Sequence, residues 1–171
     1  MNLLLRKNND RGFTLIEMIA VVIIAGIVAA VAVGSVMNTS QTNRVSQASV
    51  IKNHIRYAQS MAMKRVTIDV PVWGIKCDGA AYWLFNNIAP DTPANQVIIP
   101  GEDNVQISLA NKNITLTAFT VFFDGNGRPY TAYTDATTNV PVAAALAVTV
   151  GSLPAGSSGT FSIAPETGFI P

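Results

Sequence analysis

Cysteine and histidine are almost absent from this 171-residue chain, which contains one of each, Cys77 and His54. A single thiol cannot form a disulfide within the chain, so the fold must be held together by its core. We expect Cys77 to be a buried structural thiol, with an intermolecular bridge as the alternative. A zinc site needs several Cys or His ligands, and the chain has too few of them. No metal and no cofactor are therefore expected.

Charge is also sparse, since Asp, Glu, Lys and Arg make up 12% of the residues, with 11 basic and 10 acidic side chains. A nucleic-acid binder needs a basic stripe that neutralises phosphates. After Lys76 the chain offers only Lys112 and Arg128 for this purpose. DNA is therefore not an expected partner.

Residues for catalysis are lacking as well. A nucleophilic triad needs a base, a nucleophile and an orienting group in contact, and nothing in the spacing of His54 and Cys77 brings them together. Asp124-Gly125-Asn126-Gly127 partly resembles a calcium loop, but the Glu at the twelfth loop position is missing, so we expect a structural turn. The sequence assigns no catalytic residue, and we predict that the chain is not an enzyme.

The chain does contain one long apolar run behind a basic leader that includes Arg6, Lys7 and Arg11. From Phe13 to about Met37, about 25 residues carry a single charge, and as a helix they would measure about 37 Å, enough for a bilayer core of about 30 Å. A buried helix of a soluble protein has a similar composition. The basic flank and the position beside the N-terminus favour a membrane-spanning segment.

The single charge in this run is Glu17. A carboxylate at the bilayer centre costs roughly 2.5–3.5 kcal/mol on insertion scales, and less near the interface. Glu17 either lies near the lipid headgroups or forms an ion pair with a positive group that is supplied later. A cut between Gly12 and Phe13 would create such a partner, the new α-amine of Phe13.

The sequence G-F-T-L-I-E-M at residues 12–18 resembles the class III signal of type IV pilins and type II secretion pseudopilins. The resemblance implies that prepilin peptidase cuts after Gly12 and methylates Phe13, and that Glu17 pairs with the amine of a neighbouring subunit. It also implies other pilin subunits, an inner-membrane assembly platform and membrane lipid as partners. The chain departs from the family in having Gly34 where a proline is frequent, and in lacking a C-terminal disulfide.

The expected domains are a cleaved leader over residues 1–12, a transmembrane and filament-core helix over 13–37, an amphipathic helix over 38–65 and a β-rich head over 66–171. The leader would stay cytoplasmic, and the head would face the periplasm of a Gram-negative cell. Removing residues 1–12 takes away Arg6, Lys7, Arg11 and Asp10, which leaves 8 basic and 9 acidic side chains. The predicted class is α+β, with a long helix packed on an antiparallel sheet as in pilins.

Within the helix, apolar residues at spacings of three and four predict a stripe that packs on the head: Ala48, Ile51, Ile55, Ala58 and Ala62. The polar residues Asn38–Asn43 predict an interruption. Asp78-Gly79 predicts a hairpin between residues 73–77 and 81–85. Further strands are expected at residues 66–70, 105–109, 114–123, 128–133, 142–150, 161–163 and 168–170, with loops at 86–96, 135–139 and 151–159.

Three segments of the head narrow the resemblance: residues 56–66, F-F-D-G-N-G-R-P at 122–129, and E-T-G at 166–168. They resemble the GspH/FimT-like minor pilins, and residues 73–82 resemble the MshC-type minor pilin of mannose-sensitive haemagglutinin pili. The implied function is a structural minor pilin or pseudopilin. The alternative is a tip module that binds DNA, an adhesion target or secreted cargo. Four aromatic residues would form either its binding surface or, as alternation favours, part of the core: Trp73, Tyr82, Trp83 and Phe85.

Overall fold

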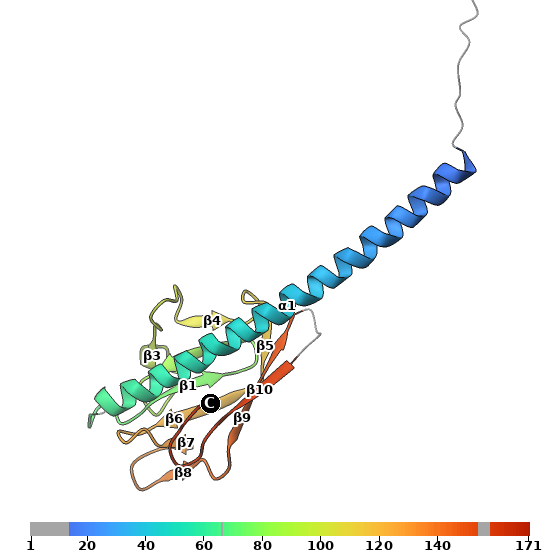
Figure 1. Ribbon diagram of the computed structural model, residues 1–171. Helices are drawn as coiled ribbons and strands as arrows, with labels where there is room; N and C mark the ends of the chain where they lie inside the picture. The colour runs from blue at the N-terminus through green and yellow to red at the C-terminus, as the bar shows by residue number, and fades with distance from the viewer. Residues whose placement is uncertain (1–13, 66, 154–157) are drawn as a thin grey trace, which may run out of the picture. The chain divides into compact units, whose positions relative to one another are not determined.

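The computed structural model describes residues 14–65, 67–153 and 158–171, without the side chains of residues 32–40. Its contacts divide the chain into two units, with the boundary between Asn38 and Thr39. Helix α1 spans Leu15–Arg65 (Figure 1). Within the described residues it is followed by a short 3-10 helix, η1 (Pro93–Asn95), and ten strands.

The strands form two antiparallel sheets. The larger sheet has the order β3-β2-β1-β6-β7-β8, with β4 also paired to β2, and the smaller has the order β10-β9-β5. The strand bounds are β1 Trp73–Cys77, β2 Ala81–Phe85, β3 Gln96–Val97, β4 Gln106–Ser108, β5 Ile114–Leu116, β6 Phe119–Phe123, β7 Pro129–Tyr133, β8 Asn139–Pro141, β9 Leu146–Ser152 and β10 Ser158–Ile163.

The second half of α1 packs on the sheets through one face. Ile51, Ile55, Ala58 and Ala62 are fully buried, and they share a cluster with core residues of both sheets. Spacings of three and four place these four residues on one side of a helix with 3.6 residues per turn. The predicted stripe and the predicted α+β class are therefore confirmed.

Helix α1 continues without a break through residues 38–43. The interruption predicted there is wrong as secondary structure, because a few residues of low helix propensity inside a long helix cost only fractions of a kcal/mol each. The boundary between the two units nevertheless falls inside this polar segment.

The predicted hairpin is confirmed in β1 and β2, which pair with Cys77 opposite Tyr82. The Asp78 N–H donates to the carbonyl of Ala81 at 3.1 Å. The Asp78 carboxylate accepts the N–H groups of Ala80 and Ala81, each at 2.8 Å, so one side chain holds the turn.

Strand β2 sends alternate side chains to two separate cores. Tyr82 and Leu84 join the cluster under α1, whereas Trp83 and Phe85 belong to a second cluster with Val72, Phe122 and Tyr130. Trp73 is buried in the first cluster. All four aromatic residues are thus core, whereas alternation alone placed half of them there, because both faces of β2 are covered. None of the four forms an open binding surface.

Cys77 is 2% exposed, which confirms the prediction of a buried thiol. Burial raises the pKa of this thiol, so it remains protonated at neutral pH.

Two predicted strands are turns instead. Of residues 66–70, Val66 lies outside the described residues, and Thr67 and Val70 exchange backbone hydrogen bonds with each other at 2.9 and 3.3 Å. Residues 168–170 pair with no strand, because the chain turns back on itself: Gly168 N–H donates to Ala164 and Ala164 N–H to Phe169, both at 2.9 Å. At residues 168–170 the side chains still alternate between core and solvent, which is the pattern of a strand, although the backbone turns. Residues 67–69 are all exposed, so their apolar alternation does not correspond to a buried face.

The run predicted as one strand at 114–123 is two strands in different sheets. β5 pairs with β9, whereas β6 pairs with β1 and β7. The chain changes sheets at Thr117, whose N–H donates to Thr149 O and whose hydroxyl accepts the Thr149 N–H, both at 3.1 Å. β8 was not predicted, and β9 begins at Leu146 rather than at Val142.

Candidate functional site

Of the three residues predicted at the assembly site, Gly12 and Phe13 lie outside the described residues. Glu17 lies in the first turn of α1 and is exposed. A carboxylate in this position faces the positive end of the helix dipole, which favours it electrostatically.

Thr14 caps the helix in front of Glu17. Its hydroxyl oxygen accepts the Glu17 N–H at 3.3 Å, and its carbonyl accepts the N–H groups of Glu17 and Met18 at 3.1 and 3.2 Å. Thr14-Leu15-Ile16-Glu17 has the T-x-x-E pattern of a capping box, in which the N3 glutamate supports the N-terminal turn. This pattern is visible in the sequence, and our sequence reasoning missed it.

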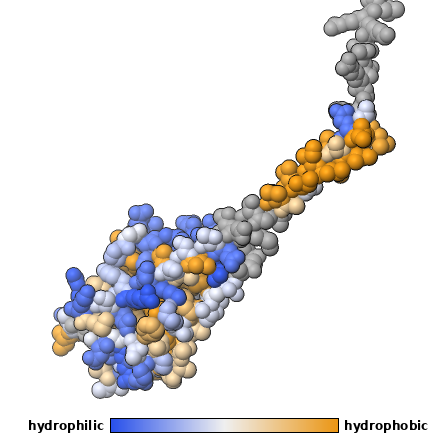
Figure 2. All heavy atoms as spheres, viewed as in Figure 1, coloured by the Kyte–Doolittle hydropathy of each residue, from blue (hydrophilic) through white to orange (hydrophobic). Residues whose placement is uncertain are grey.

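The apolar surface of α1 before residue 32 is exposed on all sides. Every large hydrophobic side chain from Leu15 to Val31 is between 50% and 79% exposed, and the consecutive residues Val21, Val22, Ile23 and Ile24 are all among them. Consecutive residues point in directions about 100° apart, so apolar side chains lie on every side of this segment. The side visible in Figure 2 is mostly hydrophobic. A helix that is hydrophobic all round requires cover from lipid or protein.

In the part of the chain that the structure describes, no helix combines the length and the hydropathy that a membrane span requires.

The three head segments singled out by the sequence meet at Gln59 of α1. The Gln59 side-chain amide donates to Gly127 O and to Thr167 O, both at 2.8 Å. Arg128, next to Gly127, forms an ion pair with Glu166 at 2.8 Å. The segments at 56–66, 122–129 and 166–168 therefore form one structural joint, which fixes two loops of the head to the helix.

The last described segment, residues 164–171, lies along the same helix. Arg56 donates to Ile170 O and Lys52 donates to Pro171 O, both at 2.7 Å. With Gln59, these helix residues have the spacing i, i+4, i+7, so a single row of donors on α1 holds backbone carbonyl oxygens of this segment. Ile170 is 1% exposed and fills the core beneath.

Gly168 lies at the tightest point of the joint. Its φ is +64°, and a Cβ there would lie 2.6 Å from Gln59 Nε2 and 3.0 Å from Gly127 O. We expect Gly168→Ala to reduce the free energy of unfolding by about 2 kcal/mol or more, because the left-handed backbone costs about 1–2 kcal/mol and the Gln59 hydrogen bonds must also shift. Urea unfolding of the full chain in detergent, followed by fluorescence of the buried Trp73 and Trp83, measures this loss.

Gly79→Ala is the matched control. Gly79 has a φ of +95°, but a Cβ there meets nothing within 4 Å, so its substitution reports backbone strain alone. If Gly168→Ala costs no more than Gly79→Ala, the joint does not hold the helix.

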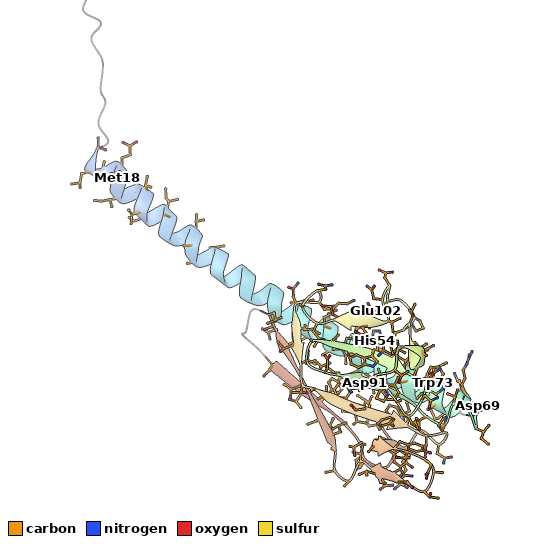
Figure 3. The ribbon with its side chains drawn as sticks, turned by 180° about the vertical axis from the view of Figure 1, so that it is seen from behind. Met18, His54, Asp69, Trp73, Asp91 and Glu102 are labelled. Carbon is orange, nitrogen blue, oxygen red and sulfur yellow. The ribbon has the colours of Figure 1, made fainter. Side chains whose placement is uncertain are left out.

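His54 makes a polar contact between α1 and the core. Its Nδ1 lies 3.0 Å from the hydroxyl of Tyr82, which is 1% exposed. Burial lowers the pKa of His54. The charge of Glu102, which is labelled with His54 in Figure 3, opposes this shift, and the charge of Lys112 adds to it. Glu102 and Lys112 form an ion pair with each other at 2.9 Å. Burial also raises the pKa of Tyr82, so its hydroxyl stays protonated. The arrangement favours a neutral imidazole in the folded head.

This contact predicts a pH-dependent stability. Because the folded pKa of His54 is below its unfolded value near 6.5, the unfolded chain binds more protons between these two values. The free energy of unfolding should therefore be highest above about pH 6.5 and fall as the pH drops toward the lowered pKa. Urea unfolding at pH 7.5 and pH 5 should show this fall in the wild type and a smaller fall in His54→Gln, which cannot titrate. Equal falls would show that His54 does not couple pH to stability.

The acidic side chains of the head were also considered as metal ligands. Within them, no group of three or more His, Cys, Asp or Glu side chains is placed to hold a metal ion. The Asp124 carboxylate is used inside its own turn, where it accepts the N–H groups of Asn126 and Arg128 at 2.9 Å and the Tyr130 hydroxyl at 3.0 Å. The Asp124–Gly127 segment is thus a structural turn, as predicted.

Residues 7–33 match the family described as the prokaryotic N-terminal methylation motif. No curated protein and no solved structure matches the chain. The match supports a type IV pilin-like or pseudopilin-like protein that is membrane-anchored or pilus-associated. The motif implies processing by prepilin peptidase and assembly with other pilin subunits.

Proposed function

We propose that this chain is a minor pilin or pseudopilin, a structural subunit that is assembled into, or primes, a type IV-type pilus or a type II secretion pseudopilus. The observation that carries the proposal is the methylation motif at residues 7–33, which covers the predicted Gly12–Phe13 junction and Glu17. The apolar surface of α1 that follows, exposed on all sides, supports a role in lipid before assembly and in a filament core afterwards.

In this proposal prepilin peptidase cuts between Gly12 and Phe13 and methylates the amine of Phe13. Residues 13–37 anchor the subunit in the inner membrane as a single span, residues 38–65 pack on the head, and the head lies in the periplasm. Glu17 pairs with the Phe13 amine of a neighbouring subunit during assembly. The resemblance of residues 56–66, 122–129 and 166–168 supports a GspH/FimT-like minor pilin, and that of residues 73–82 supports the MshC type of the haemagglutinin pilus as a more specific assignment.

The alternative, a tip module that binds DNA, an adhesion target or cargo, has less support in the head. The four aromatic residues considered for a binding surface are buried. Lys76, Lys112 and Arg128 each pair with an acidic side chain, at 2.6, 2.9 and 2.8 Å, which reduces their value for phosphate contacts. Salt-dependent DNA binding by the purified protein would favour this alternative.

The intact mass of the protein purified from a cell that expresses prepilin peptidase tests the proposal directly. One measurement reports both the loss of residues 1–12 and the gain of a methyl group on Phe13. A mature protein that begins at Met1 would overturn the proposal.

A further inference from the structure

Ile68 has the largest exposed fraction, 96%, among the large hydrophobic side chains of the described residues. It lies in the turn that follows α1. There the Thr67 N–H donates to Val70 O at 2.9 Å, and the Val70 N–H donates to Thr67 O at 3.3 Å and to the Thr67 hydroxyl at 3.2 Å. Turns usually carry Gly, Asn, Asp or Ser, whereas β-branched residues favour strands. The turn itself therefore gives no reason for an isoleucine at this position.

A second exposed isoleucine lies in the neighbouring loop. Ile88 is 41% exposed, and the side-chain amide of Asn87, the residue before it, donates to the backbone oxygen of Asp69 at 3.4 Å. Asp69 follows Ile68 in the chain and is labelled in Figure 3 near the end of α1. The two isoleucines therefore belong to the same end of the head.

The loop that carries Ile88 is held by hydrogen bonds of its own. The indole N–H of the buried Trp83 donates to Pro90 O at 2.8 Å, and the Asn95 side chain donates to Ala89 O at 2.9 Å. Both isoleucines are thus presented by backbone that is already fixed, so binding them costs little conformational entropy.

Two cations adjoin these isoleucines. Lys64 and Arg65 lie in the last turn of α1 and are exposed, and neither side chain has an ion pair or a hydrogen bond to any residue that the structure describes. The negative end of the helix dipole favours cations in this position and leaves their charged groups in solvent. Asp69 is exposed at the same end, whereas Asp91 of the loop pairs with Lys76 at 2.6 Å. This end therefore carries both signs of charge, with a positive excess.

Lys64, Arg65, Ile68 and Ile88 together form the end surface of the head, and their chemistry indicates what would cover it. Fixed, protruding apolar side chains fit a hollow in a protein, and the adjacent cations favour carboxylates at the border of that hollow. An anionic membrane would attract the two cations but repel the carboxylate of Asp69 beside Ile68. A protein can offer groups of both signs, so the end surface favours a protein partner.

We propose that the end surface docks into an apolar hollow, bordered by Asp or Glu, on a neighbouring pilin-type subunit. A protrusion on one subunit and a hollow on the next form a head-to-tail contact, which can repeat along a filament. This inference rests on the proposed function, because assembly supplies the neighbour.

The test uses the full chain in cells that assemble filaments of this type. A photo-reactive p-benzoylphenylalanine in place of Ala89, which is exposed beside Ile88, should form an adduct with another subunit that carries a methylation motif. Mass spectrometry should place the crosslink in a segment that contains Asp or Glu. Ile68→Asp should lower the adduct yield about tenfold or more, the loss expected when one buried isoleucine is removed from a contact.

Val140→Asp is the matched control for this substitution. Val140 is 54% exposed on β8, which lies at the opposite edge of the larger sheet from β3, the strand that follows the loop of Ile88. Its replacement should leave the adduct yield unchanged. Because Ile68 and Val140 are both exposed, urea unfolding should show that each variant keeps the fold.

The contribution of charge is measured with Lys64→Gln, Arg65→Gln. This double variant should lower the adduct yield about threefold or more, because exposed ion pairs are individually weak. Its control is Asn104→Asp, Asn111→Asp, which makes the same change in net charge at two exposed positions of the head and should leave the yield unchanged.

Four results would overturn the inference. They are an adduct with phospholipid, an adduct with a protein that lacks a methylation motif, no adduct at all, and an adduct whose yield either Ile68→Asp or Lys64→Gln, Arg65→Gln leaves unchanged.

Intact mass separates this failure from failure of the proposed function. If the leader is removed and the protein is found in sheared filaments but gives no adduct, only the inference about the end surface fails. If the leader is retained, the proposed function fails, and the inference falls with it.

Discussion

Replacing Gly12 by Val should leave residues 1–12 attached to nearly all of the protein. The peptidase must reach the backbone between Gly12 and Phe13, and a branched side chain beside that bond obstructs access, whereas Gly presents only backbone. The intact mass of the variant should therefore be that of the uncut chain, without a methyl group, because methylation requires the new amine of Phe13.

Gly26→Val is the control for the substitution itself. Gly26 lies inside α1, and a Cβ there meets nothing within 4 Å, so the added side chain enlarges the apolar surface of the helix without a clash. This variant should be cut and methylated as the wild type is. Normal cleavage of Gly12→Val would show that the peptidase does not act at this junction.

The retained leader should also block assembly. An uncut chain carries Arg6, Lys7, Asp10 and Arg11 in front of Phe13, so no α-amine is available at that position to pair with a neighbouring Glu17. The variant should stay in the membrane fraction and be absent from sheared filaments.

The sequence was sufficient for the parts of the fold that depend on local periodicity. The apolar residues from Ile51 to Ala62 recur at spacings of three and four, which place them on one face of the helix, and this face is buried as predicted. The Asp78-Gly79 turn is held by hydrogen bonds from its own backbone to the Asp78 side chain, so the hairpin could also be predicted correctly. Both features are encoded within a few neighbouring residues.

Features that depend on distant contacts could not be predicted in this way. The change of sheet at Thr117 requires Thr149, which lies 32 residues away. The row on α1 joins Lys52, Arg56 and Gln59 to carbonyl oxygens more than 100 residues later. Carbonyl acceptors exist at every residue, so no side-chain pattern reveals which ones a helix will bind.

Glu17 now has two possible roles that the same substitution would disturb. By the capping-box pattern, its side chain at N3 would support the start of α1, and loss of a cap typically costs about 1 kcal/mol. As the partner of a neighbouring Phe13 amine, it would neutralise a charge in a low-dielectric filament core. Removing one member of a buried pair costs about 3–5 kcal/mol, because the other charge is left unpaired.

Three variants separate these roles. Glu17→Gln keeps a side chain that suits the N3 position but removes the charge. Thr14→Ala removes the hydroxyl cap but keeps the charge, and Glu17→Val removes the charge and the N3 side chain but keeps the Thr14 cap. If the charge pair controls assembly, the Gln and Val variants should both be inserted and cleaved, yet fall about 100-fold or more in sheared filaments, whereas Thr14→Ala should fall only about fivefold. If support of the helix start is the main role of the Glu17 side chain, Gln should assemble normally, and Val should be impaired by no more than the loss of Thr14→Ala.

The measurement is co-purification of each tagged variant with sheared filaments, normalised to the cleaved subunit in the membrane fraction. Cleavage is expected to be intact in every variant, because the predicted cut at Gly12–Phe13 lies outside the substituted positions. If Glu17 only lies near the headgroups, all three variants should assemble as the wild type does, and removal of the charge should strengthen membrane retention. Normal assembly of the cleaved Gln variant would exclude the charge pair. It would leave the pilin-like assignment standing, because that assignment rests on the methylation motif and not on the partner of Glu17.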